Sequence, residues 1–205
     1  MAVAIILMSV LGVASVSFVF FRIAEALFRR NDRSRPALPT VDRVGVPITV
    51  WTGDDIHSLP DRSAVRAHVA HLLASPSRRS VGLVCFFEFD EMNRVAAEHH
   101  EEVVLETARR LHQACRADDL IGRSGANQLL VVAAGVYDND GALALAARLG
   151  RLAALPIEIG DQIIVSPASV GVTNLLPGDA AEEALLRAEE HMHIARGDLE
   201  PDIGI

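Results

Sequence analysis

The segment Arg116–Val132, which reads RADDLIGRSGANQLLVV, constrains the fold more than any other part of the chain. Its first apolar run, Leu120–Gly122, predicts a short strand, and a second apolar run begins at Leu129. The residues between these runs, Ser124 to Asn127, are small and turn-prone, which is typical of a β-hairpin. A hairpin tip lifts its backbone N–H groups clear of the sheet, where a phosphate or a partner can meet them. We therefore expect the rest of the chain to be organised around this hairpin.

The other elements follow from hydrophobic spacing. The nearly continuous apolar run Val81–Phe89 predicts a strand that is covered on both faces or lies at the centre of the sheet. A long helix is expected at Asn93–Cys115, and a second hairpin around Gly160-Asp161. Further helices are expected after Arg62, at Ala142–Leu155 and at Ala180–Arg196. Strands that alternate with helices, together with two hairpins, predict an α/β fold of the ferredoxin-like sandwich type.

The N-terminal residues 1–21 contain no charged side chain. At a rise of about 1.5 Å per residue they would form about 30 Å of helix, which matches one bilayer core. Arginines dominate the charges that follow, so the positive-inside tendency predicts a single-pass plasma-membrane protein whose C-terminal domain is cytoplasmic. We expect residues 1–30 to be a transmembrane helix with a basic juxtamembrane segment. A cleaved signal peptide and a buried helix of a soluble protein are the alternatives.

Composition indicates where the folded domain begins and which kinds of partner and metal site are excluded. Residues 31–53 are rich in Arg, Pro, Asp, Thr and Gly, which predicts a linker before a domain at residues 54–197 and a tail at 198–205. The net charge of −8 and the 4% aromatic content argue against nucleic acid as a partner. Cys85 and Cys115 lack metal or redox spacing and are interpreted as reduced, packed thiols. The clusters of histidine and glutamate are interpreted as solvated helix faces, so no metal site is expected.

The hairpin and its surroundings resemble the GGDEF family, the diguanylate cyclases. The family pattern is Arg-x-x-Asp, five residues, then Gly-Gly-Asp-Glu-Phe. Here Arg116 and Asp119 are followed, after five residues, by GANQL at Gly125–Leu129. The segment DDIHSLPDR at residues 54–62 and the Ser169–Val172 strand resemble further family segments, in the family's order. The resemblance implies the nucleotide-cyclase-like α/β sandwich of this family, preceded here by one transmembrane helix, and a role in bacterial cyclic di-GMP signalling.

The resemblance also implies a GTP site with bound magnesium, which this chain alters. In the family, one carboxylate at the end of the first strand and the Glu of the hairpin hold the cation. Either Glu88 or Asp90 would fill the first position, whereas the second is the neutral Gln128. The family's segment that recognises guanine is shorter here and lacks its Asn. The degenerate active-site positions are Glu88, Asp90, Gly125, Ala126, Asn127, Gln128, Leu129 and Arg196.

The altered positions predict a domain that is not an enzyme, with no catalytic residue, no metal ligands and no cofactor. Magnesium would be needed only if the chain were an active cyclase. The retained pair Arg116 and Asp119 corresponds to the family's inhibitory site for cyclic di-GMP, where the guanidinium and carboxylate meet guanine or phosphate. The same pair is also a common capping and ion-pair arrangement at a helix end, so a purely structural role stays open.

Three functions therefore remain open. The first is a membrane-anchored, catalytically silent GGDEF module that regulates or scaffolds and is a candidate cyclic di-GMP receptor. The second is a weakly active diguanylate cyclase. The third is an accessory subunit of a membrane protein complex. The expected partners are the membrane through residues 1–21, cyclic di-GMP, and a second copy or a membrane-complex protein.

Overall fold

The computed structural model describes residues 51, 55–74, 81–136 and 138–198. The predicted transmembrane helix at residues 1–30 lies outside the described residues, as do nearly all of the predicted linker and tail. Among the helices that are described, none is both long enough and apolar enough to cross a bilayer. The membrane anchor and its orientation therefore stay predictions.

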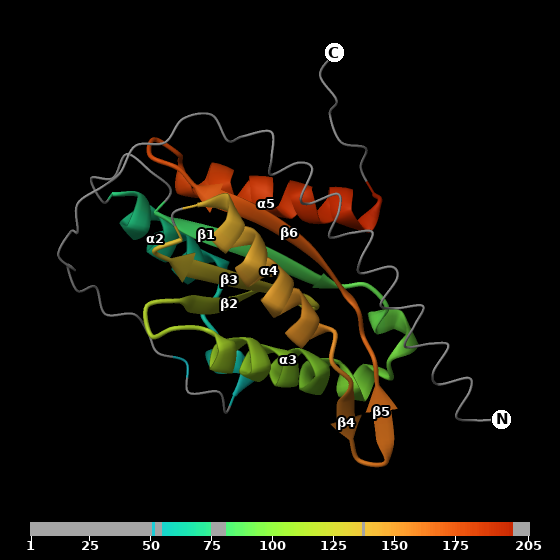
Figure 1. Ribbon diagram of the computed structural model, residues 1–205. Helices are drawn as coiled ribbons and strands as arrows, with labels where there is room; N and C mark the ends of the chain where they lie inside the picture. Colours follow the sequence, from blue (N-terminus) through green and yellow to red (C-terminus); the bar gives the residue numbers. More distant parts are fainter. Residues whose placement is uncertain (1–50, 52–54, 75–80, 137, 199–205) are drawn as a thin grey trace.

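A four-stranded antiparallel sheet forms the centre of the fold, in the order β2-β3-β1-β6 (Figure 1). Its strands are β1 (Gly82–Phe89), β2 (Leu120–Gly125), β3 (Gln128–Ala134) and β6 (Ala168–Leu175). A separate hairpin pairs β4 (Ile157–Ile159) with β5 (Gln162–Ile164) and projects away from the main sheet in Figure 1. Both predicted hairpins are present.

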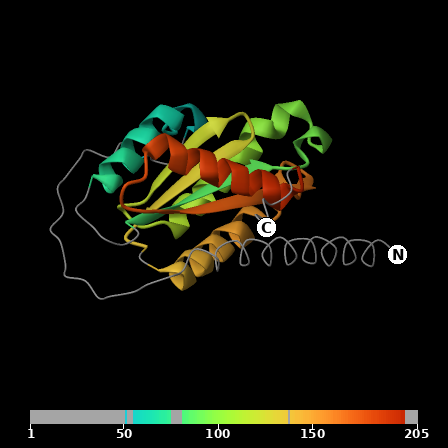
Figure 2. The same cartoon turned by 90° about the horizontal axis from the view of Figure 1, so that it is seen from above.

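Helices cover both faces of the sheet (Figures 1 and 2). They are α2 (Arg62–Leu73), α3 (His100–Ala114), α4 (Asn139–Ala153) and α5 (Ala181–Arg196). Strand β1 lies in the middle and alternates between the two cores, with Leu83 and Phe87 packed on the α3–α4 side and Val84 and Phe86 on the α2–α5 side. This confirms the mixed α/β sandwich and explains why the strand reads as a continuous apolar run.

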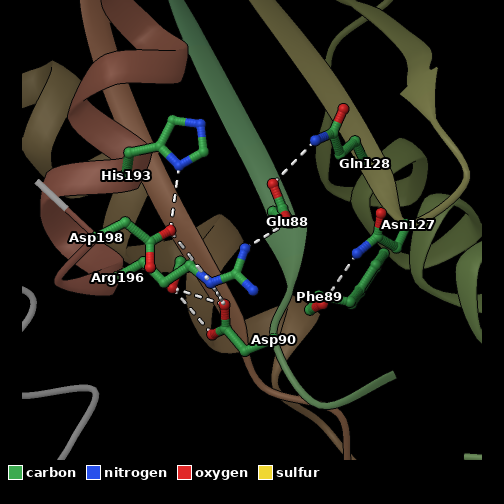
Figure 3. A network of polar contacts seen from close by, with 9 residues as sticks. Glu88, Phe89, Asp90, Asn127, Gln128, His193, Arg196 and Asp198 are labelled. Carbon is green, nitrogen blue, oxygen red and sulfur yellow. Dashed lines mark hydrogen bonds and ion pairs between the residues drawn. The ribbon is translucent and has the colours of Figure 1, made fainter. Parts of the chain in front are cut away.

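Helix α5 lies directly on strand β6. A Cβ atom added at Gly171 would lie 1.9 Å from the Ala188 carbonyl oxygen and 2.3 Å from the Met192 amide nitrogen. The His191 ring also reaches β6, with its Nδ1 atom 2.7 Å from the Val172 carbonyl oxygen. The helix ends at Arg196 and is capped by Gly197, whose positive φ of 89° suits a residue without a Cβ. These contacts fix the C-terminal end of α5 near the end of β1 (Figure 3).

The predicted helix at Asn93–Cys115 is wrong in its first turns. Two short 3₁₀ segments, η2 (Met92–Arg94) and η3 (Ala97–His99), come before α3. Val95 and Ala96 between them have extended backbone dihedrals, and the His100 Nε2 atom lies 2.9 Å from the Val95 carbonyl oxygen. Val95 packs against the core from this loop, so its apolar side chain is used by tertiary packing and not by a helix face.

The described chain starts at a buried tryptophan. Trp51 is 4% exposed, its indole N–H donates to the Asp55 carbonyl at 2.8 Å, and its ring meets His112 edge-on. The 3₁₀ turn η1 (Ile56–Ser58) follows, and Asp61 then caps α2 by accepting from the Ala64 amide. Trp51 falls within the predicted linker interval and is nevertheless part of the domain core.

Candidate functional site

The ends of β1 and β3 bring an acid and an amide face to face. In the sheet register Glu88 is paired directly with Gln128, and the Gln128 amide donates to the Glu88 Oε2 atom at 2.9 Å (Figure 3). The Glu88 side chain is 11% exposed. Of the two acids that the sequence offered for this place, the register thus puts Glu88, and not Asp90, beside the hairpin.

The second oxygen of Glu88 belongs to helix α5. The Arg196 Nη1 atom donates to Glu88 Oε1, and the Arg196 Nε atom lies 3.6 Å from Asp90 and 3.5 Å from Asp198 (Figure 3). Asp198 is also 3.2 Å from the His193 Nδ1 atom. One guanidinium therefore lies near three carboxylates: Glu88 on β1, Asp90 directly after β1, and Asp198 just beyond the end of α5.

Asp90 has a different set of neighbours from Glu88. The Ser169 hydroxyl lies 2.9 Å from both of its carboxylate oxygens and donates its single proton to them. Burial raises the pKa of Asp90, and the carboxylates of Glu88 and Asp198 raise it further, while the Ser169 hydroxyl and the Arg196 guanidinium oppose the rise. Asp90 thus faces β6 and Arg196, away from the hairpin amide.

The hairpin tip is tied to β1 and closed by an arginine. The Phe89 amide donates to the Asn127 carbonyl at 3.0 Å, and the Asn127 side-chain amide donates back to the Phe89 carbonyl at 3.3 Å. The Arg123 guanidinium donates to the carbonyls of Gly125 and Ala126, each at 3.0 Å. The tip carbonyls are therefore already bound within the chain.

The remaining hairpin positions have structural contacts. A Cβ added at Gly125 would lie 2.7 Å from the Gln128 side-chain oxygen. The absence of a side chain at Gly125 therefore leaves space for the Gln128 amide. Leu129 is fully buried in the α3–α4 core. The Ser124 hydroxyl accepts from Arg62, which also pairs with Glu189 on α5 at 3.0 Å. Hairpin, α2 and α5 are thus linked by polar contacts on one side of the domain.

Arg62, Arg123, Ser169 and Asp198 were not singled out from the sequence as members of this site. Arg62 and Ser169 lie in segments that resemble the family, DDIHSLPDR and the Ser-x-Gly-x strand. That resemblance predicted secondary-structure elements but no side-chain contacts. Each contact joins residues that are distant in the chain or that meet across a tight turn, and no local spacing encodes it.

The pair Arg116 and Asp119 lies at the opposite end of the hairpin from its tip. The Asp119 carboxylate accepts from the Arg116 backbone amide at 2.8 Å and from the Ala134 amide of β3 at 3.1 Å. The Asp119 amide in turn donates to the Arg116 carbonyl, which closes the turn. The Arg116 side chain is exposed. The carboxylate therefore has a structural role in holding the turn against β3.

Near this turn, His68 on α2 gives the domain a predicted pH dependence. Its Nε2 atom is buried without a hydrogen-bond partner among the described residues. Burial lowers the pKa of His68 below 6.5, His71 lowers it further, and Asp119 opposes this. Because the unfolded chain protonates first, we expect the free energy of unfolding to fall as the pH drops below about 6.5.

Urea unfolding of wild type and His68→Leu between pH 5 and 8 measures this effect. The free energy of unfolding of the variant is expected to depend less on pH, because the substitution removes the partly buried imidazole. His57→Gln, which changes an exposed histidine, is the control and should keep the wild-type slope. Parallel curves for wild type and His68→Leu would contradict the assignment.

Curated relatives share the domain but are much longer. An uncharacterised protein of Mycobacterium tuberculosis (strain H37Rv) is 25% identical over 146 residues, which is 69% of this chain and 23% of the relative. An uncharacterised signalling protein of Caulobacter vibrioides is 27% identical over 150 residues, which is 70% of this chain and 18% of the relative. The chain thus spans less than a quarter of the length of these relatives.

Solved structures show the same fold. The diguanylate cyclase SiaD of Pseudomonas aeruginosa, solved with its activator SiaC, aligns with a TM-score of 0.63 at 20% identity over 71% of this chain and 58% of SiaD. The GGDEF domain of YfiN (TpbB) from the same species aligns with a TM-score of 0.61 at 24% identity over 69% of this chain and 92% of that domain. The family model described as "Diguanylate cyclase, GGDEF domain" matches residues 52–198. Because that match covers well over half of the chain, the chain belongs to the GGDEF family.

Proposed function

We propose that this chain is a membrane-anchored GGDEF protein that does not condense GTP and acts as a regulatory or scaffold module in cyclic di-GMP signalling. The observation that carries the proposal is the contact between Gln128 and Glu88. A cyclase of this family neutralises its triphosphate with metal ions, and the hairpin carboxylate is one of their ligands. Here that position presents a neutral amide whose N–H donates to the carboxylate of Glu88 on β1.

The rest of the hairpin supports the same proposal. Binding of a phosphate at the tip would need free backbone donors and close approach, but Ala126 carries a Cβ where the family has its second glycine. The Arg123 guanidinium already donates to the carbonyls of Gly125 and Ala126. The tip is therefore stabilised as a structural turn.

The purified chain is expected to form no cyclic di-GMP from GTP with either magnesium or manganese. The physical reason is that Gln128 has no carboxylate to hold a metal ion, so the negative charge of the triphosphate is not neutralised. Product analysis by chromatography, beside an active family member as positive control, measures this. Product that is also lost in Glu88→Gln would contradict the proposal, and product that persists in that variant would reveal a contaminating cyclase.

A receptor function through Arg116 and Asp119 is the finer alternative within this proposal. One solved GGDEF domain, which aligns at 18% identity with a TM-score of 0.55, was solved to describe an interaction with cyclic di-GMP. The exposed Arg116 side chain would be available to such a ligand, whereas the Asp119 carboxylate already accepts two backbone amides. Calorimetric titration of the purified chain with cyclic di-GMP decides between the two. Heat at micromolar ligand supports the receptor, and no heat at tens of micromolar leaves the scaffold.

A protein partner would act through the membrane anchor or the domain surface. SiaD, part of which has this fold, was solved together with a protein activator. If the chain is an accessory subunit, a partner should co-purify with the full chain in mild detergent and be lost when residues 1–30 are removed. A partner that stays bound to the shortened chain would place the interaction on the domain.

A further inference from the structure

The family's divalent cation does not fit the residues that are present. A magnesium ion requires about six oxygen ligands at about 2.1 Å in octahedral geometry. At the end of β1 both oxygens of Glu88 are already acceptors, one from the Gln128 amide and one from the Arg196 guanidinium. Within the part of the chain that the structure describes, no group of three or more metal-ligating side chains is arranged to hold an ion.

Arg196 on helix α5 supplies the positive charge that offsets the carboxylates of this site. The Arg196 side chain is 31% exposed and reaches Glu88, Asp90 and Asp198 at once. A guanidinium presents its donors in a planar fork and stays protonated at any relevant pH, so it can neutralise several carboxylates together. A divalent ion at Glu88 would have to displace this fork and would be repelled by it.

Arg196 is held in place by the fold. The close contact of α5 with Gly171 and the His191 contact to the Val172 carbonyl fix the helix on β6. His193 lies beside Asp198, and Asp198 lies beside the Arg196 Nε atom, so the far side of the guanidinium is also engaged (Figure 3). This arginine therefore differs from a surface side chain that happens to lie near an acid.

We propose that the Arg196 guanidinium is the resident cation of this acidic site, so that the domain excludes divalent metal ions there and would accept one only when Arg196 is removed. The inference rests on the proposed function in one respect, since a domain that does not condense GTP does not require the metal ion for catalysis. Loss of Arg196 would leave Glu88 and Asp90 with uncompensated negative charge at a poorly solvated place. A divalent cation would then relieve that charge.

Thermal unfolding of the full chain with and without manganese tests the proposal. Wild type is expected to show the same melting temperature at all manganese concentrations in the low millimolar range. Arg196→Gln is expected to melt at a lower temperature without metal and to gain about 3–5 °C at ten times its dissociation constant for manganese. Arg187→Gln, on the same helix but paired with Asp179, is the matched control and should show no manganese effect. Should the glutamine variant not fold, Arg196→Met keeps the packed stem and replaces it.

A second readout is direct manganese binding, measured from the loss of the free-ion paramagnetic resonance signal. Arg196→Gln should bind one ion, and the double variant Glu88→Gln/Arg196→Gln should not. Wild-type binding that disappears in Glu88→Gln would overturn the proposal, as would a folded Arg196→Gln that binds no ion. These outcomes are separate from the proposed function, because cyclic di-GMP synthesis by wild type overturns the function, whereas the metal titration alone decides the role of Arg196.

Discussion

Gly171→Ala is expected to lower the free energy of unfolding of the domain by about 3 kcal/mol or more. The new Cβ would lie 1.9 Å from the Ala188 carbonyl oxygen and 2.8 Å from the Met192 Cα atom. Both are backbone atoms of α5, so no side-chain rotation can make room. Either α5 moves off β6 or the strand is displaced, and in both cases packing across the α2–α5 core is lost.

Urea unfolding followed by fluorescence measures this effect. The chain has a single tryptophan, and Trp51 is buried against His112, so its emission reports on the core. Gly150→Ala is the matched control, because a Cβ there lies 3.8 Å from Val170, an ordinary contact, on helix α4. It should stabilise the domain by about 0.5–1 kcal/mol through helix propensity. A Gly171→Ala variant within about 1 kcal/mol of wild type would show that α5 does not lie where the structure has it.

The same glycine connects the fold to the site. If α5 is displaced, Arg196 moves with it, and Glu88 loses one of its two hydrogen-bond donors. A folded remnant of Gly171→Ala should therefore share with Arg196→Gln the ability to bind manganese. The close approach of α5 to β6 thus determines whether Arg196 stays beside Glu88 at the end of β1.

The elements were predictable where one property decided them. The continuous apolar run at β1 required burial on both faces, and the small residues between β2 and β3 required a turn, so both were predicted correctly. The start of α3 was not predictable, because Val95 has helical spacing but is buried from an extended loop. Tertiary packing of that one side chain outweighed the local pattern.

The site was predictable only through the hairpin. The family spacing placed Gln128 where a carboxylate is expected, and the register then set it opposite Glu88. The Arg196 contact joins residues 108 positions apart, and the Ser169 contact to Asp90 joins residues 79 positions apart. Contacts between residues so far apart in the sequence depend on how α5 and β6 pack. The spacing of hydrophobic residues therefore does not predict them.

Asp119→Ala is expected to destabilise the domain by about 2–3 kcal/mol, whereas Arg116→Ala should change its stability by less than about 0.5 kcal/mol. The aspartate accepts two backbone amides, those of Arg116 and Ala134, and its removal leaves both without this acceptor. The arginine side chain is exposed. Asp119→Asn keeps one oxygen acceptor and should fall between wild type and the alanine variant. Urea unfolding of the three variants measures the difference.

This asymmetry separates the two interpretations of the Arg-x-x-Asp pair. A ligand site needs both side chains, so a receptor should lose affinity for cyclic di-GMP about equally in Arg116→Ala and in Asp119→Asn, whatever happens to stability. A structural turn needs only the carboxylate, so it should show the stability asymmetry without any ligand effect. An Asp119→Ala variant as stable as wild type would mean that the carboxylate is dispensable to the turn. The affinities of Arg116→Ala and Asp119→Asn for cyclic di-GMP would then decide whether the pair forms a ligand site.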